Sequence, residues 1–186
     1  MSAKALTIGA ESPNLPDLLA PWHDFYVVTG TAGATLVGLL FVAASLGSSI
    51  FTEERRAAFR AFVSPSVVHF SGALALSLAA LSPIRHWLLL GLLEGGLALF
   101  GLAYSAIILG AMIRLDLIAR IDLEDRIWYS VLPAVSYALL IAAAALLLAG
   151  QPVGLALLPS GIGLLLVVGI RNAWDITAWT ITRHRD

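Results

Sequence analysis

Residues 128–170 read WYSVLPAVSYALLIAAAALLLAGQPVGLALLPSGIGLLLVVGI, an apolar run without a charged side chain. Only Gly150-Gln151-Pro152 interrupts it. A helix needs about 20 apolar residues to cross roughly 30 Å of hydrocarbon, and each side of the interruption approaches or reaches that length. Glycine and proline flanking a polar residue mark a turn. The stretch therefore predicts two membrane-spanning helices joined as a tight hairpin.

Three more apolar stretches precede this hairpin. We predict spans near residues 25–50, 62–83, 87–113, 128–149 and 153–170, the last with a helical extension to residue 182. The composition agrees, because 59% of the residues are hydrophobic and 12% are charged, against about 45–50% and 25% in soluble domains. The sequence therefore predicts an all-α integral membrane bundle of five helices in residues 25–186, a single domain. We expect residues 1–24 to form a mostly irregular extracytoplasmic tail.

The basic residues are divided unequally between the two ends of these spans. The amino tail and the second and fourth loops contain Lys4 and Arg85. The first and third loops and the carboxyl end contain Arg55, Arg56, Arg60, Arg114, Arg120, Arg126, Arg171, Arg183 and Arg185. Short loops rich in Lys and Arg stay in the cytoplasm. We therefore predict an amino terminus outside and a carboxyl terminus in the cytoplasm.

Two further patterns mark the ends of the predicted spans. Aromatic residues of the type that form interfacial belts lie there: Trp22, Tyr26, Trp87, Trp128, Tyr129, Trp174 and Trp179. In the third loop, Asp116–Arg120 and Asp122–Arg126 have the i,i+4 spacing of salt bridges along a helix. That loop is either a solvated helical face or a docking surface for a cytoplasmic partner.

Glu94 is the first candidate for a functional residue. It lies about seven residues inside the third predicted span, roughly 10 Å below its outer boundary at 1.5 Å per residue. An acid at that depth is costly and is by default a functional-site hypothesis. Ala98, Gly101 and Ser105 share its helical face, so we expect Glu94 to point into the bundle or an oligomer axis. It is either a neutral structural acid bonded to a neighbouring helix or an ion or proton site.

His69 is the second ionisable group predicted inside the membrane, roughly 10 Å from the inner boundary. A proton path between it and Glu94 would need Ser77, Tyr104 or water between them. The alternative is a histidine that bonds to a neighbouring helix. We take Glu94, His69, Ser105 and Tyr104 as the intramembrane functional candidates.

Small residues recur in the first span. Gly30, Ala34 and Gly38 are spaced by four, with Thr31 and Thr35 beside them, and Gly101 adds a small residue to the third span. Small residues let two helices approach closely in lipid, within one chain or between chains. The alternative is a pore lined by threonines and serines, namely Thr31, Thr35 and Ser45. At the inner end of the fifth span, Arg171 and Asp175 have i,i+4 spacing and are predicted to form an ion pair.

Several kinds of chemistry are not indicated. The chain has no cysteine and a net charge of −1, which give no support to thiolate chemistry or nucleic-acid binding. Phosphate-binding, zinc-protease and serine-hydrolase motifs do not occur. On the outer side, His23, Asp24, Arg85 and His86 could come together in space; the two histidines and the carboxylate suit zinc or copper by type, but their spacing is not diagnostic. We therefore expect no catalytic residues, no metal and no cofactor.

Part of the first half has a family resemblance. The stretch DFYVVTGTAGATLVGLLFVAASL (24–46), followed by ERRAAF and LSLAALSP, resembles small bacterial multi-pass membrane proteins, some of them labelled modulators of a membrane-bound AAA protease. The better-known modulators of that protease have seven spans, whereas five are predicted here. The resemblance implies a bacterial inner membrane.

Two functional hypotheses follow. The first is a non-enzymatic membrane protein that acts in the lipid bilayer by associating with other membrane proteins or with itself, in a regulatory or structural role. The second is an oligomeric ion channel or proton-coupled carrier that uses Glu94. Five spans are too few for the common inverted-repeat transporters, so we expect such a pore to form between subunits.

Overall fold

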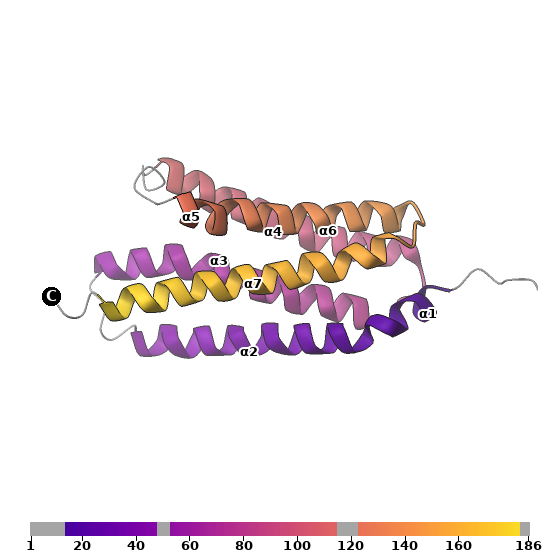
Figure 1. The fold of residues 1–186 in the computed structure, drawn as a ribbon, viewed down its shortest axis with the longest axis horizontal. Helices are drawn as coiled ribbons and strands as arrows, with labels where there is room; N and C mark the ends of the chain where they lie inside the picture. Colours follow the sequence, from indigo (N-terminus) through magenta and orange to yellow (C-terminus); the bar gives the residue numbers. More distant parts are fainter. Residues whose placement is uncertain (1–13, 48–52, 115–122, 183–186) are drawn as a thin grey trace, which may run out of the picture.

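The computed structural model describes residues 14–47, 53–114 and 123–182. Every element in these ranges is helical, and the long helices form an elongated bundle in which each runs antiparallel to the long helix before it in the chain (Figure 1). The long helices are α2 (His23–Gly47), α3 (Glu53–Leu81), α4 (Trp87–Arg114), α6 (Leu132–Leu148) and α7 (Gly154–Thr182). The short ones are α1 (Leu15–Leu19), a 3₁₀ turn (Ala20–Trp22), α5 (Leu123–Arg126) and a π-helical turn (Ile127–Val131). The prediction of an all-α bundle is confirmed.

Length and composition support a multi-pass membrane protein. Among the described residues, four helical stretches are long and apolar enough to span a bilayer: Leu15–Ser45, Trp87–Gly110, Ile127–Leu148 and Gly154–Asp175. A fifth stretch, Pro65–Leu81 of α3, is apolar but shorter. Whether α3 makes the fifth crossing therefore stays a prediction. The third-loop pairs Asp116–Arg120 and Asp122–Arg126 do not lie wholly within the described residues.

The predicted hairpin between the last two spans is present. Gly150 ends α6 with φ +70°, a conformation open to glycine at little cost. The Gln151 N–H donates to the Leu146 carbonyl (2.8 Å) and the Gly150 N–H donates to the Leu147 carbonyl (2.9 Å). This pair of hydrogen bonds is the Schellman arrangement that satisfies the last carbonyls of a helix. α7 then continues through Thr182, as the predicted extension requires.

The amino-terminal segment differs from the sequence-based expectation. Of residues 1–24, expected to be mostly irregular, the structure describes 14–24, and Leu15–Trp22 are helical. The Asn14 side chain accepts a hydrogen bond from the Asp17 N–H (3.1 Å) and caps α1. Leu15 and Leu19 are buried, 1% and 8% exposed, against the end of the bundle. Local capping and these two apolar anchors explain why the segment is ordered.

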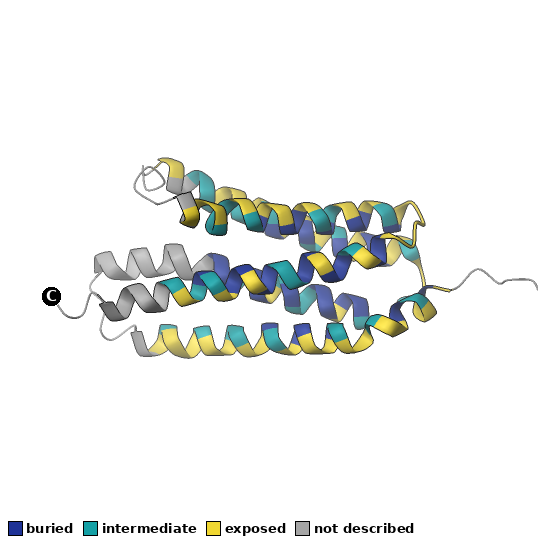
Figure 2. Ribbon diagram, in the orientation of Figure 1, coloured by how far each residue is buried: buried dark blue, intermediate teal, exposed yellow. Residues whose placement is uncertain are grey.

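α3, α6 and α7 are the long helices on which the rest of the bundle packs. α2 lies on α3, α3 contacts α7 and α4, α4 lies along α6, and α6 pairs with α7. Buried side chains face these contacts, whereas the outer faces of α2 and α4 are exposed (Figure 2). Large apolar side chains lie on those outer faces: Val28, Leu39, Phe41, Leu92, Leu99 and Phe100. That distribution is expected where lipid, not water, surrounds the bundle.

Glycines occur where helices approach most closely. A Cβ at Gly33 of α2 would lie 2.7 Å from the carbonyl oxygen of Phe70 in α3. A Cβ at Gly154 of α7 would lie 2.7 Å from the carbonyl oxygen of Ala143 in α6. Backbones at this separation leave no room for a side chain, which is how helices gain contact in lipid.

The predicted small-residue stripe of α2 is divided between two faces. Gly30 is buried, and a Cβ there would lie 3.2 Å from the Ser77 Cβ in α3. Thr31, Ala34, Thr35 and Gly38 are exposed. A Cβ at Gly38 would have no neighbour within 4 Å among the described residues. Within the chain, α2 therefore packs through Gly30 and Gly33, and the rest of the stripe faces outward.

Candidate functional site

Glu94 lies inside the bundle of a single chain. Its side chain is 0% exposed, and Ala98 and Gly101 on the same face of α4 are also buried. Leu92 and Leu93, beside it in the sequence, are exposed. Neither carboxyl oxygen of Glu94 has a hydrogen-bond partner in the described part of the chain. The predicted inward face of this helix is therefore present, and its acid retains unused hydrogen-bonding capacity.

Tyr26 of α2 lies near Glu94. The Tyr26 side chain is 1% exposed, and its hydroxyl is buried without a hydrogen-bond partner among the described residues. The Glu94 carboxyl is close enough to interact electrostatically with that hydroxyl. Tyr26 was predicted from the sequence as an interfacial anchor, and that prediction is wrong. It lies one turn inside α2 on the face that packs against the bundle.

The Tyr26 hydroxyl and the Glu94 carboxyl are not hydrogen-bonded to each other or to another described residue. A buried donor or acceptor without a partner costs about 1–3 kcal/mol, and an unpaired buried charge costs more. A protonated carboxyl offers one donor and an acceptor, and a phenol hydroxyl offers one of each. The pair can therefore bind or relay a proton, or bridge through a small hydrogen-bonding molecule.

A second polar contact joins α2 to α3. The Thr29 and Ser77 hydroxyls lie 2.9 Å apart, and the Thr29 hydroxyl also donates to the Phe25 carbonyl (2.9 Å). Gly30 leaves room for the Ser77 side chain. Ser77, expected as a possible link between Glu94 and His69, is thus hydrogen-bonded to Thr29. Thr29 carried no distinguishing signal in the sequence, because threonines are frequent in that span.

His69 is bonded to a neighbouring helix, as one of its two sequence interpretations required. Its Nδ1 lies 3.1 Å from the Tyr137 hydroxyl of α6, and both side chains are buried. Gly101 of α4 makes room for the Tyr137 ring, since a Cβ there would lie 2.6 Å from the Tyr137 hydroxyl oxygen. Ser105, one turn further along α4, lies near the same hydroxyl. Tyr104 is half-buried beside it.

Tyr137 was not singled out from the sequence. A tyrosine in an apolar span is more often an interfacial anchor than an interior residue. Its position eleven residues before the end of α6, well away from either interface, was the signal that could have identified it.

The inner end of α7 carries the predicted ion pair. The Arg171 guanidinium contacts the Asp175 carboxylate one turn later. The same guanidinium lies 3.3 Å from a Glu124 carboxyl oxygen and 5.8 Å from the centre of the Trp128 ring. The prediction of an Arg171–Asp175 pair is confirmed, and it is extended by contacts to the segment before α6.

Asn172 has a structural role that the sequence did not reveal. In the π-helical turn before α6, the Leu132 N–H donates to the Ile127 carbonyl. Pro133 has no N–H, so the Trp128 carbonyl has lost both of its usual helical donors. The Asn172 side-chain amide donates to that carbonyl (3.4 Å) from α7. Asn172 is fully buried, and it satisfies an acceptor that the irregular turn leaves open.

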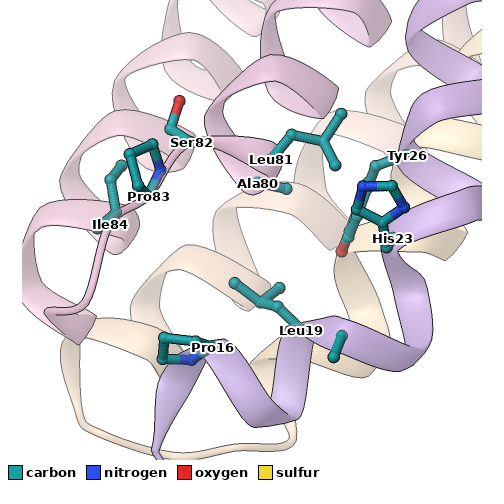
Figure 3. A pocket seen from close by; sticks show the side chains of 10 residues that line it. Pro16, Leu19, His23, Tyr26, Ala80, Leu81, Ser82, Pro83 and Ile84 are labelled. Carbon is teal, nitrogen blue, oxygen red and sulfur yellow. The ribbon is translucent and has the colours of Figure 1, made fainter.

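A pocket of about 210 Å³ lies at the α1 end of the bundle. Figure 3 shows Tyr26 and His23 on one wall, Pro83 and Ile84 on the opposite one, and Leu19 and Pro16 of α1 between them. Ala20, Ala80, Leu81 and Ser82 complete the lining. Tyr26 therefore borders the pocket while also lying beside Glu94.

The described residues contain no group of three or more histidine or acidic side chains placed to hold a metal ion. Of the four outer residues considered from the sequence, His23 and Asp24 contact each other (3.1 Å) and are exposed. Arg85 and His86 are also exposed. The chemistry that the interior offers is hydrogen bonding and proton transfer.

No protein-family model, curated protein or solved structure matches this chain. The resemblance of residues 24–46 to small bacterial membrane proteins stays a prediction.

Proposed function

We propose that this is a non-enzymatic multi-pass membrane protein that acts by associating, through the outer face of α2, with a helix of another membrane protein or of a second copy. The observation that carries the proposal is the outward-facing part of the small-residue stripe. Thr31, Ala34, Thr35 and Gly38 are exposed on α2, the helix at the edge of the bundle.

Physical reasoning favours association at this face over the other outer faces. Between helices in lipid there is little hydrophobic driving force, so close backbone approach provides much of the attraction. Bulky Leu92, Leu99 and Phe100 cover the outer face of α4, whereas on α2 the exposed small residues lie among bulky Val28, Leu39 and Phe41. The stripe on α2 leaves its backbone accessible, because a Cβ at Gly38 meets nothing within 4 Å among the described residues.

A matched pair of glycine substitutions tests the proposal. Gly38→Leu places a large side chain on the stripe, and Gly96→Leu places the same side chain on α4, where a Cβ also meets nothing within 4 Å of described atoms. Chemical cross-linking in native membranes, followed by purification, measures the associated fraction. We expect Gly38→Leu to abolish a specific cross-linked species that Gly96→Leu retains. Equal cross-linking in both variants, or no specific species in the wild type, would refute the proposal.

We also propose that the protein lies in a bacterial inner membrane with five spans, amino terminus outside and carboxyl terminus in the cytoplasm. The support is the charge asymmetry: Arg85 lies at the end of the bundle that holds α1, and Arg114, Arg126 and Arg171 lie toward the other (Figure 1). The chain has no cysteine, so single cysteines report location directly. We expect Gln151→Cys, but not Glu124→Cys, to react with an impermeant thiol reagent added to intact cells.

The second hypothesis is a channel or proton-coupled carrier that uses Glu94. Its path differs from the pore between subunits that the sequence led us to expect. Glu94 is 0% exposed within one chain, so a path through it would run inside the bundle and not along an interface between copies. The specific observation in its favour is the pair of unpartnered carboxyl oxygens. Proton and ion flux in liposomes, compared between wild type and Glu94→Gln, distinguishes it from association alone.

A further inference from the structure

Tyr26 lines the pocket at the α1 end and interacts with Glu94. The pocket is therefore a candidate entrance, and Glu94 is the candidate site behind it. The pocket lies at the end of the bundle, where exposed His23 and the Ser82–Ile84 segment form its rim (Figure 3). Its volume of about 210 Å³ is several times the roughly 30 Å³ that a water molecule occupies in the liquid. Tyr26 lines it, and Glu94 lies within electrostatic reach of Tyr26.

The polar atoms along this line have unused capacity. The Tyr26 hydroxyl and both Glu94 oxygens are buried and lack hydrogen-bond partners in the described part of the chain. The neighbouring hydroxyls are different, because Thr29 and Ser77 bond to each other. The Tyr26 hydroxyl and the Glu94 carboxyl thus have hydrogen-bonding capacity that a proton or a bridging water would satisfy.

We propose that Glu94 is a proton-exchange site that equilibrates with the aqueous phase at the α1 end, through the pocket and the Tyr26 hydroxyl. Proton uptake begins when the Tyr26 side chain, buried at rest, exposes its hydroxyl to the pocket; a hydronium ion there gives a proton to the Tyr26 oxygen and becomes water. The original hydroxyl proton of Tyr26 passes to the Glu94 carboxylate, directly after side-chain rotation or through one water. Release follows the same steps in reverse, and only O–H bonds form or break. This goes beyond the proposed association, which does not involve Glu94, and it deepens the second hypothesis by naming the route through which Glu94 exchanges protons.

The described ionisable groups on the other packed helices are exposed, bonded to a partner or at the opposite end of the bundle, which leaves Glu94 as the proton-exchanging group. From α2, Tyr26 interacts electrostatically with Glu94, whereas His23 and Asp24 are exposed. From α3 and α6, His69 and Tyr137 bond to each other further along the bundle. α7 carries its described charged groups, Arg171 and Asp175, at the opposite end, paired with each other. Exchange therefore has one short route, toward α1.

Infrared spectroscopy of the full chain in lipid nanodiscs tests the proposal. A protonated carboxyl has a carbonyl band that shifts in D₂O, and the band lost in Glu94→Gln is that of Glu94. Tyr26→Phe keeps the ring and removes the relay hydroxyl. We expect deuterium exchange at Glu94 to slow by roughly a hundred-fold, the lower end of what a positioned proton-transfer group contributes.

A second pair of variants tests the entrance. Ser82→Trp fills the rim of the pocket, whereas Ser71→Trp makes the same change on an exposed position of α3. We expect exchange to slow in the first variant and to stay at the wild-type rate in the second, with circular dichroism confirming that both are folded. Wild-type exchange rates in either Tyr26→Phe or folded Ser82→Trp would overturn the proposal. So would the absence of a Glu94 band at any pH, or its loss on adding sodium at fixed pH, which indicates a metal-cation site instead.

Discussion

Replacing Gly101 by alanine should destabilise the bundle, although alanine is the better helix former. The added Cβ would fall on the Tyr137 ring, 2.6 Å from its hydroxyl oxygen and closer still to two ring carbons. The clash is with the stiff aromatic ring, not the free end of a flexible chain. Tyr137 would have to move, and its hydrogen bond to His69 (3.1 Å) would lengthen or break.

Three terms set the expected magnitude. Alanine in place of glycine within a helix contributes about 0.5–1 kcal/mol of stability. Overpacking a close-packed interior costs about 1–3 kcal/mol. Hydrogen bonds between membrane helices contribute about 0.6 kcal/mol on average and at most about 1.7 kcal/mol. The penalties exceed the gain, so we expect Gly101→Ala to lose about 1–3 kcal/mol.

Gly96→Ala is the matched control on the same helix. A Cβ there meets no described atom within 4 Å, so only the helix-propensity term remains. We expect it to gain up to about 1 kcal/mol. The assay is unfolding in mixed micelles of increasing dodecyl sulfate fraction, followed by circular dichroism. The two variants should move the midpoint in opposite directions.

A rescue experiment assigns the effect to the ring. In a Tyr137→Leu background the clash is removed, so adding Gly101→Ala should be neutral or stabilising. The reasoning would be refuted if Gly101→Ala alone were as stable as Gly96→Ala, or if it lost the same stability with and without the tyrosine ring.

The same unfolding assay checks three further predictions. Tyr137→Phe removes only the hydroxyl bonded to His69 and should lose about 0.6–1.7 kcal/mol; no loss would mean that the bond contributes nothing. Asn172→Leu leaves the Trp128 carbonyl without a donor and should lose about 1–3 kcal/mol, and wild-type stability would contradict that role. Gly33→Ala should lose about 1–3 kcal/mol, because its Cβ would lie 2.7 Å from a backbone oxygen of α3; an increase in stability would show that α2 and α3 separate easily.

The fold was largely predictable because lipid imposes strict requirements on length and polarity. The hairpin at Gly150 and the continuation of α7 to Thr182 follow from apolar length and from turn residues. The inward orientation of Glu94 follows from the small residues on its helical face. These are one-dimensional patterns, and a single sequence displays them directly.

Contacts between helices were less predictable, because they depend on rotation and depth. The spacing-of-four pattern on α2 selected Gly30, Ala34 and Gly38; Gly30 does contact α3, but the closest approach is at Gly33, which the pattern omitted. Small residues of α2 lie on more than one of its faces, so composition alone did not identify the face that packs against α3. Tyr26 and Tyr137 were missed for a related reason, since interior and interfacial tyrosines differ only in their three-dimensional surroundings.

The segment 1–24 shows a third limit. Prolines and turn residues indicated irregular chain, but Pro16 lies in the first turn of α1, where its missing N–H is harmless. Leu15 and Leu19 then form a cover for the bundle end that is too short to produce a periodic signal.

The π-helical turn Ile127–Val131 sets the angular relation between α5 and the body of α6. A π turn is an α-helix with one extra residue, and each residue corresponds to about 100° of rotation. Deleting one residue there would give a more regular helix but would turn Glu124 away from Arg171, which it now meets at 3.3 Å. The irregular turn thus works as a phase shift: it keeps Tyr137 directed at His69 while presenting Glu124 to Arg171 of α7.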